Sequence, residues 1–202
     1  MNGNLRQRLL FASLIGGIIP LQANAGTTSL DLNVKSVIEV GTCTAEIYDG
    51  ATKTNTISLG NMPISQVINS AGNGGKSFFV RFSDCAGLPQ GMANLKISRR
   101  ASGCAGGNSD LPSFANSTAS ASGGASATAI ELWTGTTAGA GTQFDCNAPD
   151  TTAQDIDVSA AKSGSVVDYP LSARLSKPTG KADSDVKAGE FLSQTIFTIS
   201  YK

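Results

Sequence analysis

Hydrophobic and polar residues alternate along most of this chain, whereas spacing typical of an amphipathic helix is nearly absent. Between Ser77 and Ser83 every second residue is large and apolar. The same period of two recurs in the segments 30–34, 57–59, 95–97, 130–132, 169–175 and 197–201. Short alternating segments bounded by Gly, Asn, Asp and Pro are typical of half-buried antiparallel strands. About seven or eight such strands predict an all-β fold, and specifically a β-sandwich.

Two features modify this strand pattern. Pro170 lies inside one alternating segment, and because proline cannot donate a ladder hydrogen bond we expect that strand to lie at a sheet edge or to begin there. From Ala115 to Ala129 every residue except Asn116 is Ala, Ser, Gly or Thr, and residues 135–142 are similarly poor in large apolar side chains. Such segments bury little apolar surface, so we predict loops or a weakly structured insertion there.

The first 25 residues have the organisation of a secretory signal. Arginines precede an apolar run, Leu9–Ile19, and the small-residue sequence Ala23-Asn24-Ala25 follows it. This order predicts a cleavable signal peptide in residues 1–25 and a mature chain that begins at Gly26. The alternative is a membrane anchor, but the run is too short to cross about 30 Å of hydrocarbon.

The four cysteines predict disulfide bonds. An exported chain with four cysteines permits three pairings. The sequence has no C-x-x-C pair and no histidine, which disfavours zinc sites and thioredoxin-like chemistry. We favour Cys43–Cys85 and Cys104–Cys146, each joining residues 42 positions apart, formed in an oxidising compartment such as a periplasm. The second bond would tie the base of an excursion that contains residues 115–129 and 135–142.

Charge and motif content argue against catalysis and nucleic-acid binding. Without its signal peptide the chain has a slight acidic excess, which gives no electrostatic reason to bind nucleic acid. The absence of histidine removes Ser-His-Asp and Cys-His arrangements, and no phosphate loop or metal motif is present. Two carboxylate pairs, Asp155 with Asp157 and Asp183 with Asp185, could serve a glycosidase, but their polar, turn-like settings are typical of solvated loop charges. We therefore predict no enzyme activity, no cofactor and no metal.

The order of motifs along the chain carries a family resemblance. The motifs are an alternating segment that runs into the first cysteine (34–43), the sequence ISLGNM (57–62), the sequence FFVRFSDC (78–85), the sequence LSARL (171–175) ahead of AGEF (188–191), and the ending FTISYK with a penultimate tyrosine (197–202). In this order, behind a signal peptide, they resemble the type 1 fimbrial subunit family, whose members are assembled by the chaperone–usher pathway. The resemblance covers most of residues 30–202 except the low-complexity insertion.

The resemblance implies an incomplete immunoglobulin-like β-sandwich. Such a fold lacks its seventh strand and has a hydrophobic groove beside its final strand. A periplasmic chaperone first fills the groove, and the N-terminal extension of the next subunit then replaces the chaperone by β-strand addition. On this reading residues 26–40 are a donor-strand extension, and residues 41–202 are a pilin domain with an insertion bracketed by Cys104 and Cys146.

The resemblance also implies roles for residues at both ends of the mature chain. The groove-facing positions of the donor strand would be Leu30, Leu32, Val34, Ser36 and Ile38. Full burial of four large apolar side chains would contribute on the order of 6–12 kcal/mol before ordering costs. Position 36 is a serine here, whereas the family usually has glycine. The alternative is that residues 30–40 are simply the first strand of a self-contained sandwich.

On the acceptor side, the resemblance implies that the groove is lined by residues near the C-terminus. These are Phe191, Phe197, Ile199 and Tyr201, and the C-terminal carboxylate of Lys202 would be held by basic chaperone residues. For each of the four apolar residues, ordinary core packing is an equally good explanation.

The function expected from these observations is that of a structural subunit of a bacterial fimbria. It would be secreted through the periplasm to the surface of a Gram-negative cell, polymerise by donor-strand exchange and support adhesion. Its partners would be a periplasmic chaperone, an outer-membrane usher and neighbouring subunits, with no membrane insertion. The alternatives are a minor tip, adaptor or adhesive subunit that contacts a receptor, and a subunit that terminates the fibre at its base.

Overall fold

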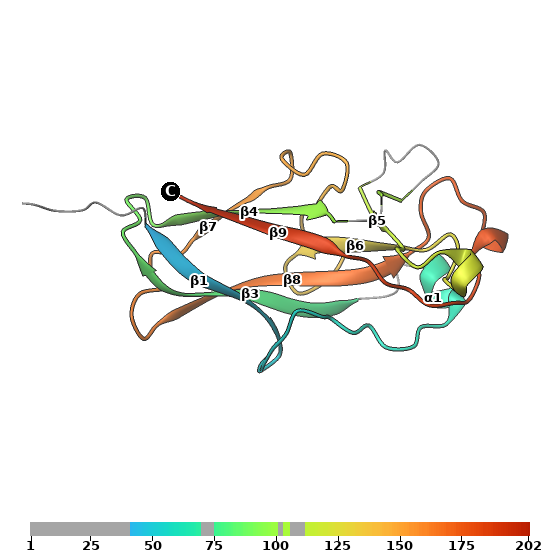
Figure 1. Ribbon diagram of the computed structural model, residues 1–202, viewed down its shortest axis with the longest axis horizontal. Helices are drawn as coiled ribbons and strands as arrows, with labels where there is room; N and C mark the ends of the chain where they lie inside the picture. Colours follow the sequence, from blue (N-terminus) through green and yellow to red (C-terminus); the bar gives the residue numbers. More distant parts are fainter. Residues whose placement is uncertain (1–40, 70–74, 101–102, 106–111) are drawn as a thin grey trace, which may run out of the picture. The chain divides into compact units, whose positions relative to one another are not determined.

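The alternating segments form the strands of two antiparallel sheets in the computed structural model (Figure 1). The structure describes residues 41–69, 75–100, 103–105 and 112–202, all of which belong to one compact unit. Its strands are β1 (Thr42–Asp49), β2 (Thr52–Lys53), β3 (Lys76–Ala86), β4 (Met92–Arg99), β5 (Phe114–Ala115), β6 (Ala129–Thr134), β7 (Gln154–Asp157), β8 (Val166–Ser176) and β9 (Thr195–Tyr201). Short helices are α1 (Ile64–Ile68), η2 (Ser120–Ser122) and η3 (Asp183–Asp185).

The two sheets pack face to face around a hydrophobic core. One sheet has the strand order β2-β1-β3-β8-β6-β5, and the other has the order β7-β4-β9. The inward faces bury the alternating apolar residues that the sequence pattern identified, since Phe82, Leu95 and Ile97 are all fully buried. The prediction of an all-β, immunoglobulin-like sandwich is therefore confirmed.

The strand that contains Pro170 is not an edge strand, which corrects the prediction. β8 lies between β3 and β6, and Pro170 pairs with Phe79 of β3. The carbonyl oxygen of Pro170 accepts a hydrogen bond from Gly135 N–H, just after β6 has ended at Thr134. In an antiparallel ladder the N–H and C=O of one residue point to the same side. The missing N–H of Pro170 therefore faces the side on which β8 has lost its strand partner, and no ladder bond is broken.

The segment 57–59 was predicted as a strand but is not one. Ile57 and Leu59 are half-buried and pack against the core, so the apolar alternation was correctly located. No strand among the described residues pairs with this segment. Alternation reports which side chains face the core, whereas a strand also needs a neighbouring backbone to complete its hydrogen bonds.

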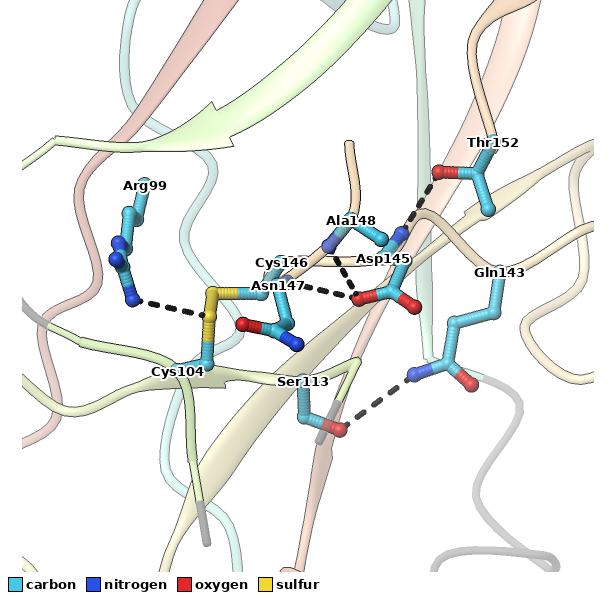
Figure 2. The surroundings of a disulfide bond; sticks show 9 residues. All are labelled: Arg99, Cys104, Ser113, Gln143, Asp145, Cys146, Asn147, Ala148 and Thr152. Atoms are coloured by element: carbon cyan, nitrogen blue, oxygen red, sulfur yellow. Dashed lines mark hydrogen bonds between the residues drawn. A yellow bond between two sulfur atoms is a disulfide. The ribbon is translucent and has the colours of Figure 1, made fainter. Parts of the chain in front are cut away.

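Both predicted disulfide bonds are present. Cys43–Cys85 joins the adjacent strands β1 and β3. Cys104–Cys146 is almost fully buried, and Figure 2 shows its surroundings: Arg99 Nη1 lies 3.6 Å from Cys104 Sγ, and Asp145 accepts hydrogen bonds from the N–H groups of Asn147 and Ala148.

The segment between Cys104 and Cys146 is not simply an excursion from the sandwich. It contains β6, which pairs with β8 in the six-stranded sheet, and the buried side chains Phe114 and Phe144. Its large apolar residues are core residues, so the second disulfide bond lies against the core.

The low-complexity segment 115–129 is ordered by backbone pairing. It contains η2, and Gly124 and Ser126 form isolated bridges with Glu190 and Lys187. The prediction of a loop is confirmed, but the loop is tightly hydrogen-bonded rather than weakly structured. Small side chains allow this because they let two backbones approach closely.

The proposed signal peptide and the donor positions Leu30, Leu32, Val34, Ser36 and Ile38 lie outside the described residues. Their roles remain predictions. In the described part of the chain no helix is long and apolar enough to cross a membrane.

Candidate functional site

In the described part of the chain, one backbone edge of the last strand has no partner. β9 pairs with β4, and the described residues contain no strand on its other side. Lys202 N–H donates to Met92 C=O and Arg100 N–H donates to Gln194 C=O, so the even-numbered residues of β9 are those bonded to β4. Antiparallel pairing alternates, and therefore the odd-numbered residues direct their N–H and C=O groups to the free edge. These residues are Thr195, Phe197, Ile199 and Tyr201.

An apolar groove of about 1120 Å³ lies beside this edge. One wall is the segment 186–195 together with Phe197, and the other is the segment 55–62, which follows β2. The floor is formed by core side chains of the six-stranded sheet, among them Phe78, Leu132 and Leu175. Two large apolar side chains that line the groove are solvent-exposed: Ile64 is 40% exposed and Leu192 is 52% exposed. The groove thus exposes part of the hydrophobic core next to a row of backbone groups that have no partner among residues 41–69, 75–100, 103–105 and 112–202.

The structure places two of the sequence-predicted acceptor residues in this groove. Phe191 and Phe197 line it, and Phe197 packs edge-on against Phe78 with ring centroids 6.5 Å apart. Ile199 and Tyr201 lie farther along the same half-buried face of β9. Lys202 is exposed and lies outside the groove.

Several groove residues were missed by the sequence analysis. The wall residue Lys187 and the loop residues Thr118, Ala125 and Thr128 carry little apolar surface, so no hydrophobic pattern marked them. Leu59 and Met62 had been noted in a motif, but their position opposite β9 depends on the tertiary fold.

Tyr201 and Lys202 connect the end of β9 to its surroundings. Tyr201 Oη donates a hydrogen bond to the carbonyl oxygen of Cys43 at 3.1 Å, which links β9 to the beginning of β1. Burial raises the pKa of Tyr201. Lys202 Nζ lies 3.0 Å from Asp155 Oδ1 on β7, and Asn94 Nδ2 donates to the same carboxylate at 2.8 Å. The hydrogen bond from Asn94, followed by that from Lys202, lowers the pKa of Asp155.

The carboxylate pairs considered from the sequence have structural partners instead of a catalytic arrangement. Asp157 accepts a hydrogen bond from Ser159 N–H, and the Ser159 bonds lower its pKa. A general acid requires a raised pKa, which neither Asp155 nor Asp157 has. Asp183 forms an ion pair with Lys177, and Asp185 accepts a hydrogen bond from Ala182 N–H. Among the described residues, no cluster of acidic or cysteine side chains is placed to hold a metal ion.

Comparison with known proteins decides the family. No family model matches the chain. The uncharacterized fimbrial-like protein YadL of Escherichia coli (strain K12) is 36% identical over 191 residues, which are 93% of this chain and 92% of the relative. The chain belongs to the family of fimbrial-like proteins. The family inferred from the order of its motifs is thereby confirmed.

Two solved structures are similar to this fimbrial-like protein. The P pilus rod subunit PapA matches with a TM-score of 0.48 and 17% identity, over 86% of this chain and 100% of that chain. The CupB6 tip adhesin from Pseudomonas aeruginosa matches with a TM-score of 0.43 and 18% identity, over 63% of this chain and 30% of the adhesin.

Proposed function

We propose that this protein is a structural subunit of a surface fimbria assembled by a chaperone and an usher, and that it polymerises by donor-strand exchange. The observation that supports this most directly is the free edge of β9 beside an open apolar groove. A row of unpaired N–H and C=O groups is a template for another strand, and an apolar groove accepts alternate side chains of that strand. The membership in the fimbrial-like family agrees with this function.

The strand that completes the sandwich is, in this proposal, the N-terminal extension of a neighbouring copy. Residues 30–38 carry apolar side chains at every second position except Ser36, which matches the requirement of a half-buried strand. A periplasmic chaperone would occupy the groove first, and an outer-membrane usher would deliver the subunit to the cell surface. The protein would support adhesion as part of the fibre.

Deletion of residues 26–38 tests the donor role. The shortened subunit should still co-purify with its chaperone, because its groove is intact, but it should fail to add onto a growing fibre. Fibre growth can be followed by the appearance of high-mass, heat-labile polymers on electrophoresis. Polymerisation of the shortened subunit at the normal rate would refute donation by this segment.

Two neighbouring residues of β9 test the acceptor role. Phe197 lines the groove, whereas Ile196 lies on the outer face of the same strand and is 44% exposed. Phe197→Asp should abolish uptake of a peptide that corresponds to residues 26–40, because a buried unpaired carboxylate is costly. Ile196→Asp should leave uptake within about twofold, since surface substitutions have small effects. Equal uptake by both variants would show that the groove does not receive the strand.

A further inference from the structure

The groove wall, residues 186–195, is held in place by a second loop. The small-residue loop, residues 116–126, runs beside the wall, and both lie at the end of the sandwich far from the C-terminus, near α1 (Figure 1). Ala125 N–H donates to Glu190 C=O at 2.8 Å, and Glu190 N–H donates to Gly123 C=O at 2.9 Å. Ser117 N–H also donates to Leu192 C=O. The wall therefore takes its position from backbone pairing with the small-residue loop.

Asn116 is the centre of this contact. Its Nδ2 donates to the carbonyl oxygens of Ala125 at 3.0 Å and Glu190 at 2.8 Å. Its Oδ1 accepts from the N–H groups of Leu192 at 3.0 Å and Thr118 at 3.0 Å. One amide thus uses both donors and its acceptor to join the loop and the wall. It is also the one residue of 115–129 that is not Ala, Ser, Gly or Thr.

Gly189 allows the two backbones to meet. A Cβ at this position would lie 2.4 Å from Ala125 N and 2.6 Å from Gly123 O. Such distances are far below van der Waals contact, so any side chain there would push the wall away from the loop. The glycine at position 189 is accordingly explained by the close approach of the wall to the loop.

We propose that Asn116 is a positioning residue for the strand-binding groove. It does not line the groove itself; it holds the wall, which does. The inference rests on the proposed function, because the ligand is the donor strand of a second copy of this chain. A wall that is already ordered removes a cost that binding would otherwise carry, and a preformed groove therefore accepts the strand faster.

The test uses the subunit held by its chaperone and a synthetic peptide of residues 26–40. The measured quantity is the rate at which the peptide displaces the chaperone, alongside the thermal midpoint of the complex. Asn116→Ala should slow displacement about tenfold, equivalent to about 1.4 kcal/mol. Gln154→Ala is the control: this amide side chain also donates a hydrogen bond, to the carbonyl oxygen of Thr152, but it lies outside the groove on β7, which does not pair with β9, and the rate should stay unchanged.

A cross-link separates positioning from general stability. Ser126 and Lys187 are antiparallel partners joined by a backbone hydrogen bond. The Cα atoms of such a pair are about 5.5 Å apart, which suits a disulfide bond. Ser126→Cys with Lys187→Cys, oxidised, should restore the normal displacement rate to Asn116→Ala, whereas Ser126→Ala with Lys187→Ala should not.

The outcomes distinguish this inference from the proposed function. If the peptide fails to displace the chaperone from the wild-type subunit, strand donation is wrong and the role of Asn116 falls with it. If the wild type takes up the peptide but Asn116→Ala does so at the same rate, only the positioning role is refuted. If Asn116→Ala slows displacement and the cross-link does not restore the rate, the positioning role is also refuted, because the slower displacement would not arise from a displaced wall.

Discussion

At the scale of single residues, two non-glycine residues in the described part of the chain have a backbone conformation that favours glycine. Ala127 has φ of 48° and Asp84 has φ of 52°. An L-residue in the left-handed region costs about 1–2 kcal/mol because its Cβ approaches the following carbonyl oxygen. Ala127 lies just after the small-residue loop, where the chain must turn sharply before it enters β6.

Ala127→Gly should therefore stabilise the folded subunit. We expect the free energy of unfolding to rise by about 0.5–1 kcal/mol, since relief of the strain exceeds the added entropy of the unfolded chain. Urea denaturation of the peptide-bound subunit measures this value. Ala129→Gly provides the contrast: Ala129 is fully buried in β6, and its variant should lose stability. A loss in the Ala127 variant would contradict the strain argument.

At the scale of elements, one acidic side chain joins three strands of the smaller sheet. Asp155 of β7 is bonded to Asn94 of β4 and to Lys202, which directly follows β9. These bonds hold the end of β9 against its neighbours through groups on the solvent side of the sheet. Because the folded-state pKa of Asp155 is lowered, its contribution is present above the unfolded pKa of about 3.9 and is lost as pH falls through the folded value.

Asp155→Asn should accordingly reduce the acid sensitivity of the subunit. The variant should be less stable than wild type at pH 7, and the difference should shrink as pH falls below about 4. Urea midpoints measured from pH 7 to pH 3 would show this convergence. Lys202→Met should act in the same direction but more weakly, because the hydrogen bond from Asn94 is the larger cause of the shift. Parallel curves for wild type and Asp155→Asn would contradict the linkage.

At the scale of the whole molecule, the two disulfide bonds hold different parts of the sandwich. Cys43–Cys85 links two neighbouring strands and is only half-buried. Cys104 is 5% exposed and Cys146 is 3% exposed, and both belong to the core cluster with Phe114 and Phe144. From the sequence alone the second bond was expected to tie the base of an excursion from the sandwich. Its burial reverses that expectation.

Removal of either disulfide bond should be strongly destabilising. Loop-closure entropy gives about 4 kcal/mol for each, because both join residues 42 apart. The double variant Cys104→Ala with Cys146→Ala should lose at least as much unfolding free energy as Cys43→Ala with Cys85→Ala, because it also leaves a cavity in the core. Denaturant titration of the peptide-bound variants measures both values. A clearly milder effect of the Cys104 and Cys146 pair would mean that the region around it repacks.

The disulfide pairing that was favoured among three possibilities is confirmed. The sequence was sufficient to predict the all-β sandwich and the strands whose alternation is long, such as β3 and β9. The sandwich and its long strands depend on local side-chain periodicity and on the spacing of the strand segments, and both can be read directly from the sequence. Pro170 and the segment 57–59 were misjudged because strand pairing is decided by backbones that are distant in sequence. The acidic partner of Lys202 was missed for the same reason.

The groove shows most clearly which features the sequence determines and which only the tertiary structure determines. The sequence determined that Phe197, Ile199 and Tyr201 would share one face of a strand, because apolar side chains at period two lie on the same side, whereas Phe191 was named only through the family resemblance. Only the tertiary structure decided that an apolar groove is open beside β9, and that residues without hydrophobic character, Asn116 and Gly189 above all, hold its wall. Hydrogen bonds such as those from Asn116 to Glu190 and Leu192 join residues 74 and 76 positions apart and leave no periodic signal, so their partners become visible only in the folded chain.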